Sequence, residues 1–226
     1  MTQQHVCQFC NKSFRRLTTL SVHMCEAKRR HSQKNETWVQ LGFMAYLQFL
    51  KQNTNVKKNI TYDDFASSNY YSGFVRFGSY VQQVQCINVK SYLHWLLKNN
   101  KKLDHWCRDS EYERWLIDYL QREAVQDALE RSVLSMEELC EGQGIALTDY
   151  FRSGKLGSII THIENGRISP WVIYNCESGI GYLSSLNEEQ INHVFKYINP
   201  DFWQEKFNNY PNDVVWIKDI LKSFGF

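Results

Sequence analysis

The stretch CQFCNKSFRRLTTLSVHMC, residues 7–25, decides the fold at the N-terminal end of this chain. Cys7 and Cys10 are separated by two residues in what reads as a tight turn, and His23 follows on a predicted helix. Two thiolates and an imidazole placed in this way can share one metal ion in tetrahedral coordination. Phe14 and Leu20 supply nearly the whole apolar core, so metal binding has to contribute the folding free energy that so small a core lacks.

The spacing of these five residues resembles that of the Cys-Cys-His-His zinc-finger family. Residues 7–23 match the family pattern Cys-x2-Cys-x3-Phe-x5-Leu-x2-His at every defined position. The resemblance implies a small ββα-type finger that binds one structural zinc ion. We therefore expect Zn as the cofactor, with Cys7, Cys10 and His23 as ligands.

The fourth ligand departs from the family pattern, because none of residues 27–29, where the second histidine would fall, can bind zinc. Two candidates remain, Cys25 and His31. Residues two apart on a helix point to different sides, so Cys25 requires the helix to loosen directly after His23. His31 lies about 12 Å further along a continuous helix, so it also requires a break. We favour Cys25, because a short distortion is easier than folding back seven residues, and keep His31 as the alternative.

The charges are segregated along the chain. Residues 1–60 carry ten Lys and Arg against two acidic residues, a net charge of +8. Residues 61–226 carry sixteen against twenty-two, a net charge of −6. A basic segment of this kind is typical of a phosphate-binding surface, whereas the acidic remainder repels nucleic acid. We expect all affinity for nucleic acid to come from residues 1–60.

The family resemblance also indicates which finger residues would face DNA. It places Arg16, Thr19 and Val22 at the base-reading positions of the finger helix. Arg16 can read a guanine through a bidentate contact, but Thr19 is tolerant and Val22 donates nothing. We expect contacts of low sequence specificity, to double-stranded DNA, from a set of mostly basic residues: Arg15, Arg16, Thr19, Lys28, Arg29, Arg30 and Lys34.

The remainder of the chain is predicted to be helical, so the fold class is mainly α: a small finger followed by a helical body. The finger with its basic flank takes residues 1–34, and residues 35–226 form the body, with a possible sub-boundary at the glycine-containing residues 141–147. Apolar periodicity and capping residues predict helices over 36–52, 109–139, 156–164, 171–175 and 214–221, and helices that begin after Thr61, Asn88 and Asn187. Residues 53–60 read as a turn-rich break, and Pro200 as a helix stop.

Few features of the body point to a further activity. Residues 156–175 outline a helix-turn-helix unit, but its second helix, WVIYNC, is too apolar to lie in a DNA groove. The segment RSGKLG, residues 152–157, lacks the first glycine and the hydroxyl residue of a phosphate-binding loop. We therefore expect a protein that is not an enzyme.

Over nearly its full length the chain resembles a group of uncharacterised zinc-finger proteins of large contractile-tailed phages, including those of cyanobacteria. The segments that carry this resemblance are HMCEAKRRH, ETWVQLGFMAYLQFL, INVKSYLHWLLKNNKKLDHWC and GRISPWVIYNC. It implies a cytoplasmic protein, in the host cytoplasm if phage-encoded, that acts in replication, transcription or genome handling. No stretch is apolar enough for a membrane span.

The sequence thus predicts a nucleic-acid-binding zinc-finger protein. An alternative is an adaptor, or a component of phage assembly or of the virion, whose finger docks on protein. In either case the helical body would bind a host or phage protein.

Overall fold

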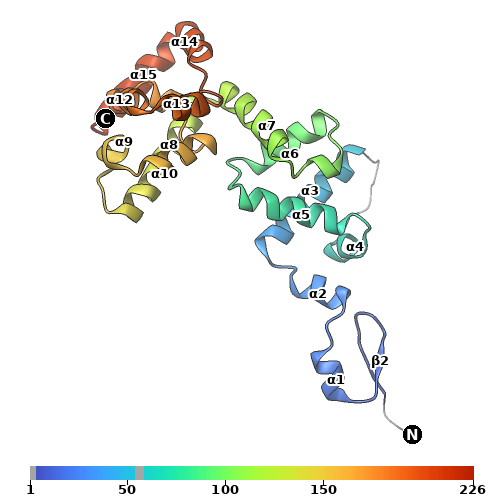
Figure 1. Cartoon of the computed structure of the whole chain (residues 1–226). Coiled ribbons are helices and arrows are strands. Elements are labelled where there is room, and N and C mark those ends of the chain that lie inside the picture. Colours follow the sequence, from blue (N-terminus) through green and yellow to red (C-terminus); the bar gives the residue numbers. More distant parts are fainter. Residues whose placement is uncertain (1–3, 54–58) are drawn as a thin grey trace. The chain divides into compact units, whose positions relative to one another are not determined.

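The computed structural model describes residues 4–53 and 59–226, and its fold is mainly α, as predicted. Over these residues fifteen α-helices accompany one two-stranded sheet (Figure 1). The chain divides into two compact units, Met1–Arg108 (unit 1) and Asp109–Phe226 (unit 2). The helical segment 35–226 is therefore shared between both units, and its glycine-containing residues 141–147 lie within unit 2. In the described part of the chain, no helix is long and apolar enough to cross a membrane.

Unit 1 contains the finger and the helices that follow it. Its elements are β1 (His5–Val6), β2 (Ser13–Phe14), α1 (Leu17–Val22), α2 (Glu26–Ser32), α3 (Thr37–Asn53), α4 (Tyr62–Ser67), α5 (Tyr71–Gln83), α6 (Val89–Lys98) and η1 (Leu103–His105). Thr61 and Asp64 form the predicted capping box of α4, and the Asn88 side chain caps α6. Residues 54–58 of the predicted break lie outside the described residues.

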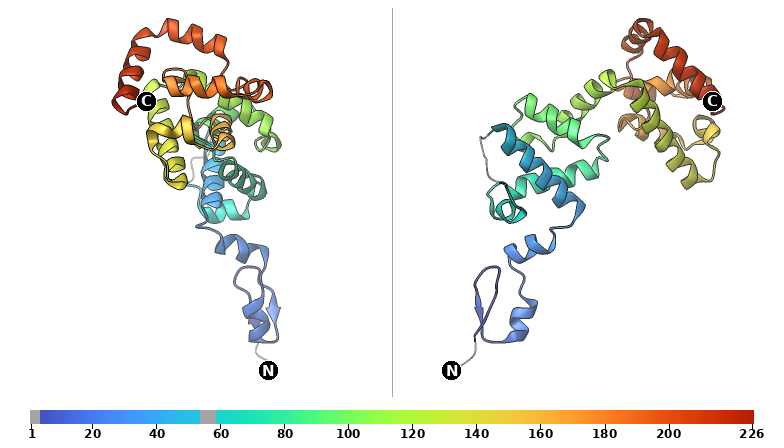
Figure 2. Two further views of the ribbon diagram at one scale, coloured as in Figure 1. Left: turned by 60° about the vertical axis from the view of Figure 1, so that its left-hand side comes forward. Right: turned by 180° about the vertical axis from the view of Figure 1, so that it is seen from behind.

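Helices α3 and α5 pack against each other at two glycines. A Cβ on Gly42 would lie 2.6 Å from the Phe74 carbonyl oxygen, and one on Gly78 would lie 1.9 Å from that of Trp38. Both glycines therefore let the two backbones approach more closely than any side chain would permit. The views in Figure 2 show α3 and α5 side by side.

Aromatic rings fill the core of unit 1. Trp106 is fully buried, and its ring centroid lies 5.5 Å from that of Phe74 and 5.4 Å from that of Phe77. Its indole Nε1 donates to the Lys101 carbonyl at 2.9 Å, while the Tyr92 hydroxyl donates to the Trp106 carbonyl at 3.0 Å. These bonds fix the end of α6 and the turn after it.

Unit 2 is a cluster of short helices around a buried tryptophan pair, Trp171 and Trp203, whose ring centroids lie 5.8 Å apart. Its elements are α7 (Asp109–Arg122), α8 (Val125–Gln143), η2 (Leu147–Asp149), α9 (Tyr150–Ser153), α10 (Leu156–Glu164), α11 (Pro170–Ile173), α12 (Glu177–Ser185), α13 (Glu188–Val194), α14 (Pro200–Asn209) and α15 (Pro211–Ser223).

Two helix predictions for unit 2 are wrong. The helix expected over 109–139 is interrupted at Glu123 and Ala124, because the buried Glu123 carboxylate binds Arg131 and the hydroxyl of Ser169. Pro200 was expected to stop a helix, but α13 already ends at Val194 and Pro200 begins α14, since the Asn199 side chain caps that helix and proline is tolerated at the first helical position. The helix-turn-helix outline lacks an exposed second helix, because Trp171, Val172 and Ile173 are buried.

Candidate metal centre

The hairpin of the finger positions two thiols. Strands β1 and β2 are antiparallel, with His5 opposite Phe14. After β1, the Cys7 amide donates to the Lys12 carbonyl at 2.9 Å and the Asn11 amide donates to the Cys7 carbonyl at 2.8 Å. Asn11 has a φ of 57°, a left-handed conformation that asparagine tolerates well. This tight turn holds Cys7 and Cys10 close together.

The end of the finger helix supplies the other two donors. Helix α1 stops at Val22, and His23 and Cys25 lie in an extended segment. Side chains two apart in an extended chain point to the same side, whereas on a helix they diverge. His23 and Cys25 can therefore face the hairpin together, while Met24 between them is 60% exposed. The helix thus loosens directly after His23, as a Cys25 ligand requires.

Cys7, Cys10, His23 and Cys25 form a group that can hold a metal ion. Their four donor atoms all lie within 4.8 Å of one another. The Cys7 and Cys25 Sγ atoms are 4.0 Å apart, far beyond the length of a disulfide bond, which is about 2 Å. The Cys10 Sγ lies 3.3 Å from the Nε2 atom of His23. Four donors converging on one point, rather than bonding in pairs, are typical of a metal site.

Backbone amides and one lysine support this group. The amide of Phe9, followed by that of Cys10, hydrogen bonds the Cys7 thiol and lowers its pKa, which favours the thiolate that binds metal. Cys25 is also the N-cap of α2, since its Sγ accepts from the Lys28 amide at 3.5 Å. The Lys28 Nζ donates to the His23 carbonyl at 3.1 Å, which ties α2 back to the extended segment.

His31, the alternative fourth ligand, lies elsewhere. It sits near the end of α2, and its ring centroid is 5.1 Å from that of Phe9. Because α2 runs without a break from Glu26 to Ser32, His31 stays on that helix and outside the metal group. The structure therefore brings Cys25, and not His31, to the other three donors.

The predicted nucleic-acid contacts separate into two groups. Arg15, Arg16 and Thr19 are exposed at the start of α1 and on it. The basic residues of α2 and the turn after it lie in contacts within unit 1. Their partners are the His23 carbonyl for Lys28, Glu26 for Arg29, Glu26 and the Ala66 carbonyl for Arg30, and the Tyr62 ring for Lys34.

Arg30 has the most extensive of these contacts. Its Nη1 donates to the Ala66 carbonyl at 2.6 Å, and its guanidinium lies 4.3 Å from the ring centroid of Tyr71. Its side chain is only 20% exposed, and its own carbonyl accepts from the Tyr62 hydroxyl at 2.6 Å. Arg30 therefore joins α2 to α4 and α5, so the prediction that it is an open phosphate contact has to be revised.

The structure adds two features that the sequence reasoning missed. Lys12 is exposed on the finger hairpin, with its Nζ 5.9 Å from the Phe14 ring centroid, and it precedes Arg15 by three residues.

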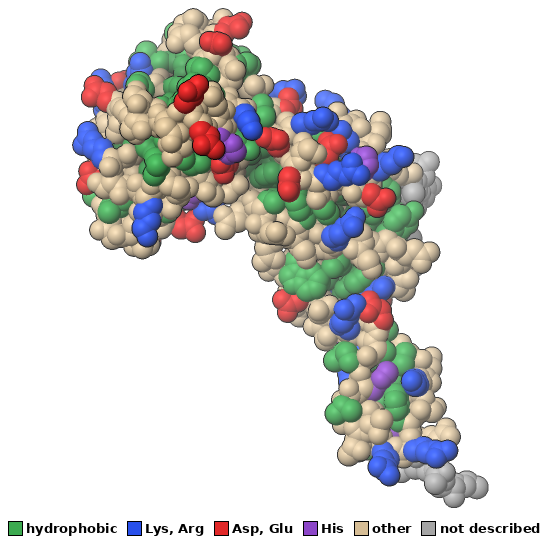
Figure 3. Space-filling view, in the orientation of Figure 1, with side chains coloured by type: hydrophobic (Ala, Val, Ile, Leu, Met, Phe, Trp, Pro, Cys, Tyr) green, Lys and Arg blue, Asp and Glu red, His purple; other side chains and the backbone are tan. Residues whose placement is uncertain are grey.

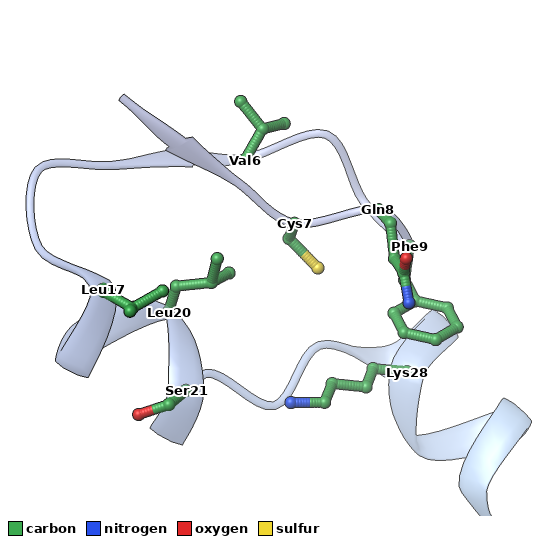
Figure 4. A pocket seen from close by; sticks show the side chains of 8 residues that line it. All are labelled: Val6, Cys7, Gln8, Phe9, Leu17, Leu20, Ser21 and Lys28. Atoms are coloured by element: carbon green, nitrogen blue, oxygen red, sulfur yellow. The ribbon is translucent and has the colours of Figure 1, made fainter. Parts of the chain in front are cut away.

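The second feature is a groove of about 320 Å³ beside the metal group. Figure 4 shows Leu17 and Leu20 at one end, Phe9 at the other, and the Cys7 thiol directed into it. Its lining consists of Val6, Cys7, Gln8, Phe9, Leu17, Leu20, Ser21 and Lys28.

The sequence could not predict this groove, because it does not show that the side chains of Val6 and Leu17 are 51% and 62% exposed. The spacing of the finger residues assigns only Phe14 and Leu20 to the core and gives no packing partner for the other apolar side chains.

The chain matches no family model, no curated protein and no solved structure.

Proposed function

We propose that this chain is a zinc-finger protein that contacts the backbone of nucleic acid through cations on the metal-stabilised finger. Zinc fits the donor set, because three thiolates and one imidazole are common in structural zinc sites. Bond lengths of 2.3 Å for sulfur and about 2.05 Å for nitrogen put tetrahedral donors about 3.6–3.8 Å apart. The observed separations of 4.0 Å and 3.3 Å bracket these values.

The charge of the finger supports this proposal. Residues 4–25 contain Lys12, Arg15 and Arg16 and no acidic residue. A zinc ion bound by three thiolates and a neutral imidazole has a net charge of −1, so the loaded finger keeps a net charge of about +2. Positive charge near a polyanion releases condensed counterions, and this release provides sequence-independent affinity.

The observation that carries the proposal is the exposure of Lys12, directly before β2, and of Arg15 and Arg16, directly after it. Val22 at the last base-reading position is 80% exposed and apolar, so it offers no hydrogen bond to a base edge. One bidentate arginine discriminates by only about 1–3 kcal/mol. We therefore propose binding of low specificity, to double-stranded DNA, by a protein that is not an enzyme and lies in the cytoplasm, where thiols stay reduced.

The test uses the zinc-loaded full chain and fluorescent 20-base-pair duplexes of unrelated sequence. Arg15→Glu/Arg16→Glu should weaken binding by a similar factor on each duplex and lower the salt slope by up to about 1.8, at about 0.9 for each lost phosphate contact. Lys218→Glu/Lys222→Glu, two exposed residues of α15, is the control with the same charge change. Equal losses in both variants would refute a finger contact.

The adaptor function is the second candidate, and the groove favours it. An apolar depression rimmed by exposed Val6 and Leu17 is suited to an apolar side chain of a partner protein. An interface of this kind responds little to ionic strength, in contrast to phosphate contact. Leu17→Ser should therefore weaken salt-resistant association with a partner from the source cells and leave the salt slope of DNA binding unchanged.

A further inference from the structure

The difference in net charge is larger between the two structural units than between residues 1–60 and residues 61–226. Unit 1 contains sixteen Lys and Arg against five acidic residues, a net charge of +11, whereas unit 2 contains ten against nineteen, a net charge of −9. The finger, residues 4–25, supplies only three of the sixteen cations. Most of the positive charge of unit 1 therefore lies outside the finger.

A run of 39 residues in unit 1 contains no acid. Residues 65–103 hold five Lys and Arg and neither Asp nor Glu. Ordinary solvated helices mix both signs, because oppositely charged residues three or four apart stabilise them. Helix α7 shows such mixing, because Asp118 pairs with Arg122 four residues later. The absence of acids over α5, α6 and the following turn therefore distinguishes this part of unit 1 from an ordinary solvated surface.

Four of the five cations of this run lie on α6 or in the turn directly after it. One side of the helix, Tyr92, Leu93, Leu96 and Leu97, is buried in the core. Lys90, His94 and Lys98, at positions i, i+4 and i+8, are exposed, as is Lys102 just after the helix. Lys101 extends over the Trp95 ring, 5.4 Å from its centroid. We name Lys90, His94, Lys98, Lys101 and Lys102 the α6 surface. Figure 3 shows several Lys and Arg side chains on the face of unit 1 that is in view.

We propose that the α6 surface is a second contact surface for the phosphate backbone of nucleic acid. This inference rests on the proposed function and extends it from the finger to the helical part of unit 1. Lys90 to Lys98 span about 12 Å along the helix, and one DNA strand carries a phosphate about every 3.4 Å of axis, so three or four phosphates lie within reach. It also replaces the expectation that all affinity comes from residues 1–60.

The chemistry of the α6 surface favours nucleic acid over a protein partner. Protein interfaces have an apolar centre with a polar rim. Among the described residues, no large hydrophobic side chain between Tyr71 and Val133 is exposed. The next acid in the sequence, Asp104, lies 3.9 Å from Arg76 and is itself 90% exposed. A surface of several lysines without an apolar centre matches phosphates better than it matches a folded partner.

The test measures binding of the zinc-loaded full chain to a 20-base-pair duplex at several salt concentrations. The α6 variant is Lys90→Glu/Lys98→Glu/Lys102→Glu, and the control with the same charge change is Lys155→Glu/Lys218→Glu/Lys222→Glu, three exposed lysines of unit 2. We expect the α6 variant to bind at least tenfold more weakly than the control, with a salt slope lower by up to about 2.7. Circular dichroism shows whether both variants keep the helical content of the parent chain.

The possible outcomes separate this inference from the finger contact. If the finger variant Arg15→Glu/Arg16→Glu loses affinity and the α6 variant behaves as its control, the inference is wrong and the proposed function stands. If only the α6 variant loses affinity, the inference stands and the finger contact is wrong. A parent chain that binds no duplex overturns both, and salt-sensitive self-association in sedimentation velocity would then assign the α6 surface to the acidic unit 2 of a second copy.

Discussion

The two units use their basic residues differently. In unit 1, Lys90, Lys98 and Lys102 are exposed on a stretch of sequence, residues 65–103, that contains no acid. In unit 2, Arg131 binds the Glu123 carboxylate with two nitrogens, and the Lys206 ammonium donates to the Gln121 carbonyl. Unit 1 thus has a group of exposed lysines on a stretch of sequence without acids, whereas Arg131 and Lys206 of unit 2 take part in internal packing.

Desolvation explains this difference. The Lys206 ammonium lies 5.2 Å from the Trp203 ring centroid and 5.5 Å from that of Trp171, and burial lowers its pKa. A charge held among rings and paired internally has no remaining capacity to bind phosphate. Net charge therefore indicates a binding surface only for basic residues that remain exposed and have no acid beside them.

The largest effect should come from the metal group of unit 1, which has no counterpart among the described residues of unit 2. Zinc binding to a small finger has an apparent free energy of about 10–16 kcal/mol, so Cys25→Ser should abolish high-affinity binding. His31→Ala, the matched control, should retain one zinc per chain by elemental analysis. If only His31→Ala loses the metal, His31 and not Cys25 is the fourth ligand.

Chelation should then separate the finger from the helices. The finger has little core without metal, whereas α3–α6 and unit 2 bury large aromatic side chains. We expect chelator to remove the finger structure and leave most of the helical circular dichroism unchanged. Global loss of helicity would mean that the metal group also stabilises the helical core.

The next largest effect should come from the buried ion pair of unit 2. The Glu123 side chain is 1% exposed, and Glu123→Gln leaves the Arg131 guanidinium buried without its partner charge, at a cost of about 3–5 kcal/mol in unfolding free energy. The control is Glu138→Gln, whose side chain is 70% exposed beside Arg167, and which should cost less than about 1 kcal/mol. Urea denaturation measures both changes. Equal losses would show that burial does not govern the strength of these pairs.

Arg29 and Arg30 provide a comparison within unit 1. Both bind Glu26, but the Arg29 side chain is 56% exposed, whereas Arg30 also contacts Ala66 and Tyr71. Arg30→Gln should cost about 2–3 kcal/mol in stability, because a charge-assisted hydrogen bond and a cation–π contact are lost together. Arg29→Gln should leave stability nearly unchanged and lower the salt slope of DNA binding by about 0.9. The opposite pattern would restore Arg30 as a phosphate contact.

The smallest effect concerns pH in unit 2. Burial lowers the pKa of His162, whose Nδ1 lies 3.0 Å from the Tyr150 hydroxyl. The unfolded chain therefore binds this proton more readily, so the stability contributed by neutral His162 is present above the ordinary histidine pKa and is lost as pH falls below about 6.5. At pH 5 the loss should be at most about 2 kcal/mol.

This pH effect can be isolated by denaturation with chelator present, so that metal release does not contribute. His162→Gln should remove that part of the difference between pH 7 and pH 5. An unchanged difference in the variant would assign the effect to other groups.

Much of the candidate site could be predicted from the sequence, because its signals are local. Cys7, Cys10 and His23 were identified from spacing alone, since a tight turn and a short helix fix how far apart such donors lie. The caps of α4, α6 and α13 were likewise predicted from Thr61, Asn88 and Asn187, because a capping side chain binds amides only two or three residues away.

The tertiary structure decided what depends on residues far apart in the chain. The Glu123 carboxylate meets Ser169 46 positions later, and that contact ends a helix which local periodicity would continue. Arg30 meets Ala66 36 positions away, which turns an expected phosphate contact into a structural residue. The sequence by itself determined three of the metal donors, Cys7, Cys10 and His23, and the helix starts that have a local capping residue. Only the packing determined which cations remain exposed, because exposure depends on partners that sequence spacing does not bring together.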